Sequence, residues 1–119
     1  MTAPATPVEV VRNLTALTDE LRHLTAALRA SEQDAAVKRH VADMAESRAF
    51  LAADGAMDLR KHQARVAADE KEGAAKVAEA LVRVLRQEIR AVETRIDVGR
   101  TYGATVRAEL KTLNYGETP

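Results

Sequence analysis

Three arginines at helical spacing are the residues of this chain best suited to hold a phosphate. Arg83, Arg86 and Arg90 are separated by three and four positions, so on a helix they share one face. Such a face can contact nucleic-acid phosphates, or it can be the solvated flank of a coiled coil that pairs with acidic residues. No aromatic or glycine-rich element accompanies the arginines, and 18 basic residues are matched by 18 acidic ones. We favour the solvated flank and keep nucleic-acid binding as the alternative.

A single Glu-x-x-His step, Glu20 to His23, is the nearest approach to a metal motif. Di-iron helical bundles need two such steps and two further inward carboxylates. Neither His40 nor His62 has a glutamate three residues before it. A Ser-His-Asp arrangement, a phosphate loop and a dinucleotide fingerprint are also missing from the sequence. We therefore expect no catalytic residue, metal or cofactor, and a non-enzymatic protein.

Gly99 and Gly103 form a small-x-x-x-small pattern, which lets another helix approach closely. One interpretation is that a bulky side chain, such as a leucine from the N-terminal half or from another subunit, covers the glycines. The other is an intersubunit contact or docking groove with Tyr102 at its edge.

The two glycines lie on a seam whose steps alternate between four and three residues from Ala78 to Leu113. A repeat averaging 3.5 residues over about five heptads is typical of a left-handed coiled coil. We expect this seam to contact a partner or another copy through Val82, Leu85, Ile89, Val92, Ile96, Gly99, Gly103, Val106 and Leu110.

The N-terminal half predicts two helices, over residues 7–30 and 32–53. Thr6 and Glu9 can cap the first, with Pro7 at its first position. Its leucine stripe ends at Leu28, and the step to Val37 is nine residues, about 180° around a helix. The next apolar set therefore faces the other side: Val37, Val41, Met44 and Leu51. Because Ser31 can cap a new helix, the pattern predicts a break or kink at Ala30 to Ser31.

Asp54-Gly55 is the clearest turn, and it predicts a chain reversal before a third helix over residues 56–113. The reversal sets residues 32–53 against a seam of small residues: Ala64, Ala68, Ala75 and Ala78. Residues 7–30, rich in leucine, then pair with the more apolar part of the C-terminal seam, from Val82 to Leu113. The predicted fold is all-α, an elongated antiparallel helical hairpin or coiled coil with two shorter N-terminal helices packed on one long C-terminal helix. Residues 1–6 are predicted to be disordered, and residues 114–119 to fray.

Composition indicates one small helical domain whose core is thin. Aromatic residues make up 3% of the 119 residues, and alanine is abundant along the seams. Because alanine buries little area, we expect a homo-oligomer, a dimer or larger, with a further protein partner possible. No apolar run approaches the roughly 18 residues of a membrane span. No secretory signal is recognised and there is no cysteine, so we expect a cytoplasmic protein of a bacterial host.

Two segments carry a resemblance to known proteins. They are Ala49-Phe50-Leu51-Ala52-Ala53-Asp54-Gly55 with Arg60-Lys61, and Glu79-Ala80-Leu81-Val82-Arg83-Val84-Leu85-Arg86 continuing to Thr94-Arg95-Ile96-Asp97-Val98-Gly99-Arg100 and Arg107-Ala108-Glu109. Together they resemble small helical proteins of unassigned function in phages and prophages of actinobacteria. The resemblance implies a phage-encoded accessory protein and names no reaction.

The secreted helical hairpins named for a Trp-x-Gly turn resemble this chain in length and in their two-helix plan. Their turn is replaced by Ala53-Asp54-Gly55-Ala56, and neither Tyr102 nor Tyr115 begins a Tyr-x-x-x-Asp/Glu export signal. These departures argue against that family. The sequence thus favours a self-associating helical scaffold or protein-protein interaction module of phage origin, with an accessory nucleic-acid-binding role in phage recombination or replication as the alternative.

Overall fold

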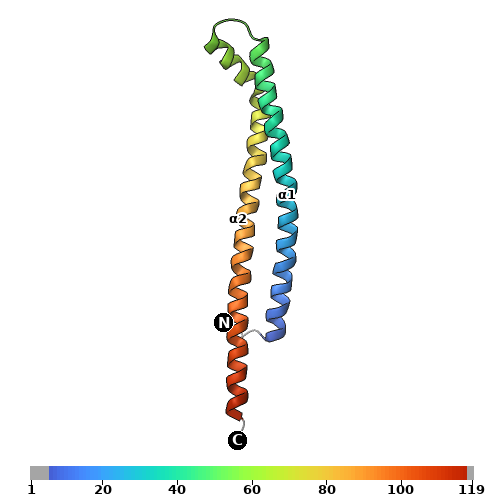
Figure 1. The fold of residues 1–119 in the computed structure, drawn as a ribbon, viewed down its shortest axis with the longest axis vertical. Helices are drawn as coiled ribbons and strands as arrows, with labels where there is room; N and C mark the ends of the chain where they lie inside the picture. The colour runs from blue at the N-terminus through green and yellow to red at the C-terminus, as the bar shows by residue number, and fades with distance from the viewer. Residues whose placement is uncertain (1–5, 118–119) are drawn as a thin grey trace. The chain divides into compact units, whose positions relative to one another are not determined.

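The computed structural model describes residues 6–117, and within that range the chain forms two α-helices and no strand (Figure 1). Helix α1 spans Pro7–Ala52 and α2 spans Met57–Glu117. Side chains are described as far as Leu113. The all-α prediction is confirmed. The N-terminal tail predicted over residues 1–6 lies, except for Thr6, outside the described residues, as do residues 118 and 119.

Helix α1 begins with the predicted capping box. The Thr6 amide donates to Glu9 Oε2 at 3.0 Å, and the Glu9 amide donates to Thr6 Oγ1 at 3.2 Å. Two backbone donors that lack intrahelical partners are thereby satisfied, which fixes the start of the helix at Pro7.

The predicted break at Ala30 to Ser31 is wrong, because α1 is continuous through both residues. Small residues, and not valines, continue the buried stripe after Leu28: Ser31 is half-buried, and Ala35 and Ala42 are buried. The four-and-three spacing therefore never changes face. The helices predicted over 7–30 and 32–53 are one helix, since no Pro or Gly interrupts it and the alanine seam gives it a continuous buried side.

The predicted reversal at Asp54-Gly55 is confirmed, and Gly55 has a φ of 109° there, which favours glycine. Arg60, near the start of α2, closes the turn from the other side. Its guanidinium carbon lies 4.3 Å from the centre of the Phe50 ring, and its Nη2 donates to the Phe50 carbonyl at 3.1 Å. The Arg60 side chain thus adds a second donor to the Phe50 carbonyl, which also accepts from the Ala53 amide at 3.3 Å, and it stacks on an aromatic face.

The chain divides into two compact units, each pairing part of α1 with part of α2. Unit 1 comprises Met1–Thr25 and Gln87–Pro119, and unit 2 comprises Ala26–Arg86. In each unit the helices are antiparallel, because residues later in α1 meet residues earlier in α2. The small-residue seam is therefore paired within unit 2 and the leucine-rich stripe within unit 1, as the sequence predicts.

Helix α2 begins one residue later and ends later than predicted. It continues past Leu113 to Glu117, so the predicted helix end at Leu113 is wrong, while the predicted fraying of the C-terminal end stays a prediction. The segment contains Gly116, yet it holds no proline before Pro119, and an isolated glycine costs about 1 kcal/mol without ending a helix.

Candidate interaction surface

The predicted partner seam of unit 2 is buried within the chain itself. Val82 is buried together with Ala35 and Ala78, and Leu28 of α1 packs against this cluster. Leu85, the next seam residue, is also buried. These side chains are therefore covered by α1 of the same chain. Their predicted role in self-association stays a prediction, and it would require α1 of another copy to replace the chain's own.

In unit 1 the seam is covered by large side chains of α1. Val92 and Ile96 are buried, and a Cβ built on Gly99 would lie 2.9 Å from Leu14 Cδ2. A Cβ on Gly103 would lie 3.0 Å from Val10 Cγ1. The interpretation that bulky side chains of the N-terminal half cover the glycines is thus confirmed, with a leucine over Gly99 and a valine over Gly103.

Seam burial decreases toward the end of α2. Ile89 and Val106 are half-buried, whereas Leu110 and Leu113 are exposed. In unit 1, Val10 of α1 already contacts Gly103, and α1 begins only three residues before Val10. The last two seam residues therefore have no α1 residue opposite them among the described residues.

All ion pairs between the helices lie on one side of unit 2, among the residues that the structure describes. Arg39 donates from Nη1 to Glu72 Oε2 at 2.6 Å and from Nη2 to Glu79 Oε1 at 2.7 Å. Arg86 Nη2 donates to Glu32 Oε1 at 3.0 Å. We call these five residues the charged flank. Arg39 joins two turns of α2, so it fixes the register of the two helices.

The hydrogen bonds of the charged flank shift the pKa values of Glu79 and Arg39. The hydrogen bond from Arg39 holds the pKa of the Glu79 carboxyl below its ordinary value, and the nearby charges of Arg83 and Lys76 act in the same direction. The hydrogen bonds to Glu79 and Glu72 in turn raise the pKa of the Arg39 guanidinium. Both groups are therefore charged at neutral pH.

The opposite side of unit 2 is aliphatic. Val41 follows Arg39 by two residues, and at 100° per residue the two side chains point about 160° apart around α1. On α2 the residues two before and two after Glu79 are Val77 and Leu81, which face away from the charged flank for the same reason. We call this side the aliphatic flank; its large members are 38% to 72% exposed: Val37, Val41, Met44, Val77, Leu81 and Val84.

Half of this flank was misassigned from the sequence and half was missed. Val37, Val41, Met44 and Leu51 were predicted to be the buried face of a second helix, and that is wrong because all four are exposed. Val77, Leu81 and Val84 were not singled out. The signal that could have found them is the alanine seam, because Ala35, Ala42, Ala75 and Ala78 already fill the buried positions and leave the valines outside.

The three arginines proposed to hold phosphates do not form a free basic face. Arg86 is paired with Glu32 in unit 2, and Arg83 adds its charge beside Glu79. Arg90, in unit 1, is exposed. Acidic partners thus engage part of the set, as expected of a solvated coiled-coil flank.

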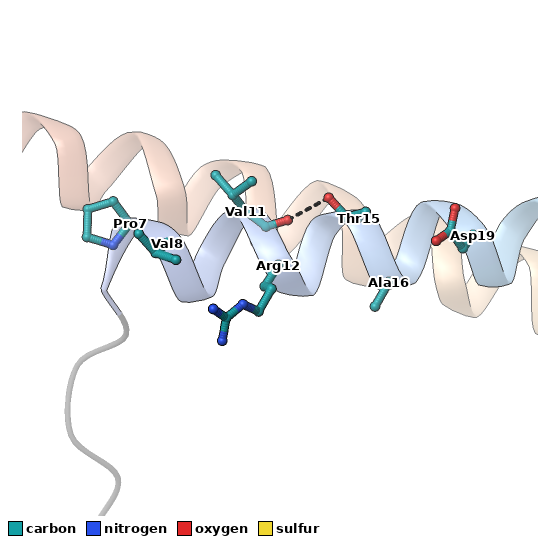
Figure 2. A pocket seen from close by; sticks show the side chains of 7 residues that line it. All are labelled: Pro7, Val8, Val11, Arg12, Thr15, Ala16 and Asp19. Carbon is teal, nitrogen blue, oxygen red and sulfur yellow. Dashed lines mark hydrogen bonds between the residues drawn. The ribbon is translucent and has the colours of Figure 1, made fainter.

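Two of the surface hollows of unit 1 differ in the number of helices that line them. One is lined by a single helix face of α1 that includes Val8, Val11 and Thr15, whose hydroxyl donates to the Val11 carbonyl at 2.9 Å (Figure 2). The other lies between the helices and is lined by residues including Leu17, Val98 and Tyr102. The first is open because one helix face cannot enclose a ligand. The second places Tyr102 beside Gly99, at the edge that the sequence indicated.

Among residues 6–117 no three histidine, aspartate or glutamate side chains gather closely enough to hold a metal ion. Glu20 and His23 are both exposed on α1. In the same range, neither helix is sufficiently apolar over a long enough stretch to cross a bilayer. Compared with family models, curated protein sequences and solved structures, the chain matches none of them.

Proposed function

We propose that this chain is a non-enzymatic helical scaffold, a protein-protein interaction module that self-associates. The observation that carries the proposal is the aliphatic flank of unit 2, where six large apolar side chains are exposed along one side of a helix pair. Apolar patches of this kind, bordered by polar residues, mark protein-protein contact sites. The phage resemblance supports an accessory protein of a phage that acts in the cytoplasm of its bacterial host.

The thin interior of unit 2 supports the same proposal. Its buried residues are mostly alanines, including Ala42, Ala64 and Ala75, each at most 1% exposed. Alanine contributes little apolar area at about 25 cal/mol per Å². Covering the aliphatic flank would add larger side chains to the buried area, so association stabilises the pair.

Sedimentation equilibrium at micromolar concentration tests the proposal. The wild-type chain is expected to be a dimer or larger, and Leu81→Glu, which places a charge in the aliphatic flank, is expected to shift it to the monomer. Val11→Glu is the matched control, because Val11 is exposed by 63% and lies in unit 1, outside this flank. A monomeric wild-type chain contradicts the proposal, and so does a Leu81→Glu variant that associates as the wild type does.

The nucleic-acid alternative makes a different prediction. Filter binding of single- and double-stranded DNA at low salt is expected to show no affinity, because Arg86 is already paired with Glu32. Steep salt-sensitive binding that is lost when Arg83, Arg86 and Arg90 are replaced together by glutamine would favour the alternative over the scaffold.

A further inference from the structure

The α1 half of the aliphatic flank is itself a heptad stripe. Val37, Val41 and Met44 are separated by four and three residues, and the same steps continue to Asp34 on one side and Arg48 on the other. A stripe with this spacing keeps one side toward a second helix over its whole length. Because the seam with α2 lies elsewhere on α1, this stripe can accept an additional helix.

The charges of the stripe are arranged symmetrically about Val41. Asp34 precedes Val41 by seven residues and Arg48 follows it by seven, so each lies about 10 Å from Val41 along the helix. Seven residues are close to two turns, and the three side chains therefore share one side of α1. Asp34 and Arg48 carry opposite charges, and both side chains are exposed.

This order makes the stripe its own electrostatic complement. When a second α1 is laid antiparallel with Val41 at the centre, Asp34 of each copy comes within about one turn of Arg48 of the other. A parallel arrangement instead places Asp34 beside Asp34 and Arg48 beside Arg48, which is repulsive. The pair of Asp34 with Lys38, at 3.0 Å, is exposed on the same helix, so the carboxylate stays reachable.

We propose that the aliphatic flank of unit 2 binds a second copy of this chain, with α1 antiparallel to α1 of the partner and Val41 at the two-fold axis. The contact is isologous, so each copy supplies both the acidic and the basic end. This inference rests on the proposed function and names its partner and register. Unit 2 then shares its aliphatic side with an identical unit and keeps the charged flank in solvent.

Disulfide trapping tests the register directly, because the chain has no cysteine of its own. Val41→Cys is expected to form a linked dimer on mild oxidation, since residues at a two-fold axis meet their own copies. Val37→Cys is the matched control: it is equally on the stripe, yet its two copies are about 12 Å apart along the helices, beyond the reach of a disulfide. Equal linkage at both positions indicates a parallel pair and overturns the proposal.

A charge exchange tests the ends of the contact. Asp34→Arg and Arg48→Asp, made separately, are each expected to raise the dimer dissociation constant by at least about tenfold, because each sets like charges against one another. The double variant is expected to return to the wild-type value. Circular dichroism of each variant checks that the helices form. A double variant as weak as the single ones overturns the proposed register.

The outcomes separate this inference from the proposed function. If the wild-type chain is monomeric, both fail. If it associates and Leu81→Glu dissociates it, but Val41→Cys does not link and the charge exchange gives no rescue, the scaffold stands and the antiparallel α1 contact is wrong. A dimer in which α1 of one copy packs against α2 of the other would associate in this way, without linkage at Val41→Cys and without rescue by the charge exchange.

Discussion

Both units of this chain pair α1 with α2, but the residues that hold the two helices together differ between them. In unit 1, large side chains of α1 lie over glycines of α2, with Leu14 against Gly99 and Val10 against Gly103. In unit 2, alanines line both helices, and Arg39 joins them from the side through two glutamates. Size complementarity thus defines the register in unit 1, whereas in unit 2 ion pairs at the flank do so.

This difference explains why large aliphatic side chains are exposed beside the seam of unit 2. Where the seam is built of alanine, the larger aliphatic residues of unit 2 stand beside it: Val37, Val41, Val77 and Leu81. Unit 1 buries large apolar side chains in its own seam, whereas unit 2 leaves several of them exposed and available to another surface. We therefore expect the seam of unit 1 to be sensitive to the removal of bulk and the seam of unit 2 to be sensitive to its addition.

The largest effect is expected from truncating the seam of unit 1. Ile96 is 6% exposed, so Ile96→Ala removes buried methyl groups and leaves a cavity that the glycine-rich neighbourhood cannot fill. We expect a loss of about 3 kcal/mol in the free energy of unfolding, measured by urea titration. Val98→Ala, at a position 63% exposed two residues away, is the control and should change the free energy by less than about 0.5 kcal/mol. Equal losses would show that Ile96 is not part of a packed interior.

The opposite change tests the seam of unit 2. Ala75 is fully buried, so Ala75→Leu forces a large side chain into a contact between small residues. We expect a loss of about 2 kcal/mol. Ala36→Leu is the matched control, because Ala36 is exposed in the same unit and, at 100° per residue, points about 140° away from Val41 of the aliphatic flank. A gain in stability from Ala75→Leu would mean that the helices of unit 2 can move apart freely, and the contrast between the two seams would be lost.

A pair of glycine substitutions sharpens the comparison further. Gly73, in unit 2, has no atom within 4 Å of a built Cβ, so Gly73→Ala should gain up to about 1 kcal/mol from helix propensity. Gly103→Ala should lose that gain, because its Cβ meets Val10 Cγ1 at 3.0 Å and a valine in a helix has essentially one rotamer. Compared with the wild type, the melting temperature should rise for Gly73→Ala and should not rise for Gly103→Ala. Equal stabilisation by both substitutions would show that the Val10 side chain moves aside to accommodate the new Cβ.

Sequence reasoning located what periodicity and local chemistry determine. The capping box at Thr6, the turn at Gly55 and the seam from Ala78 to Val106 all follow from spacing or from a single residue's backbone preference. It failed at Ala30 to Ser31 because only large apolar residues were taken as the stripe. Alanine is a weak signal on hydropathy alone, yet a small side chain is what a close helix pair buries.

The charged flank lay beyond prediction for a different reason. Arg39 bonds Glu72 and Glu79, which are 33 and 40 positions away, and their pairing depends on how α2 registers against α1. The chain offers 18 basic and 18 acidic residues, so composition does not select these partners. The same holds for Arg60 over Phe50, since only the turn geometry brings them together.

The smallest expected effect is a pH dependence of the unfolding free energy, and it tests the charged flank alone. The hydrogen bond from Arg39 lowers the pKa of Glu79 below its ordinary value of 4.5, so the native state holds this carboxylate ionised more firmly than the unfolded chain does. The stability it contributes is complete above that ordinary value and is lost as the pH falls through the lowered pKa. The difference in unfolding free energy between the wild type and Arg39→Gln should therefore shrink as the pH is lowered from about 7 to about 3. Arg22→Gln, which removes an exposed contact of 3.9 Å with Asp19, is the control and should show little dependence. Urea titrations across this range measure both, and parallel pH profiles for the wild type and Arg39→Gln would mean that size complementarity alone, and not charge, sets the register of unit 2.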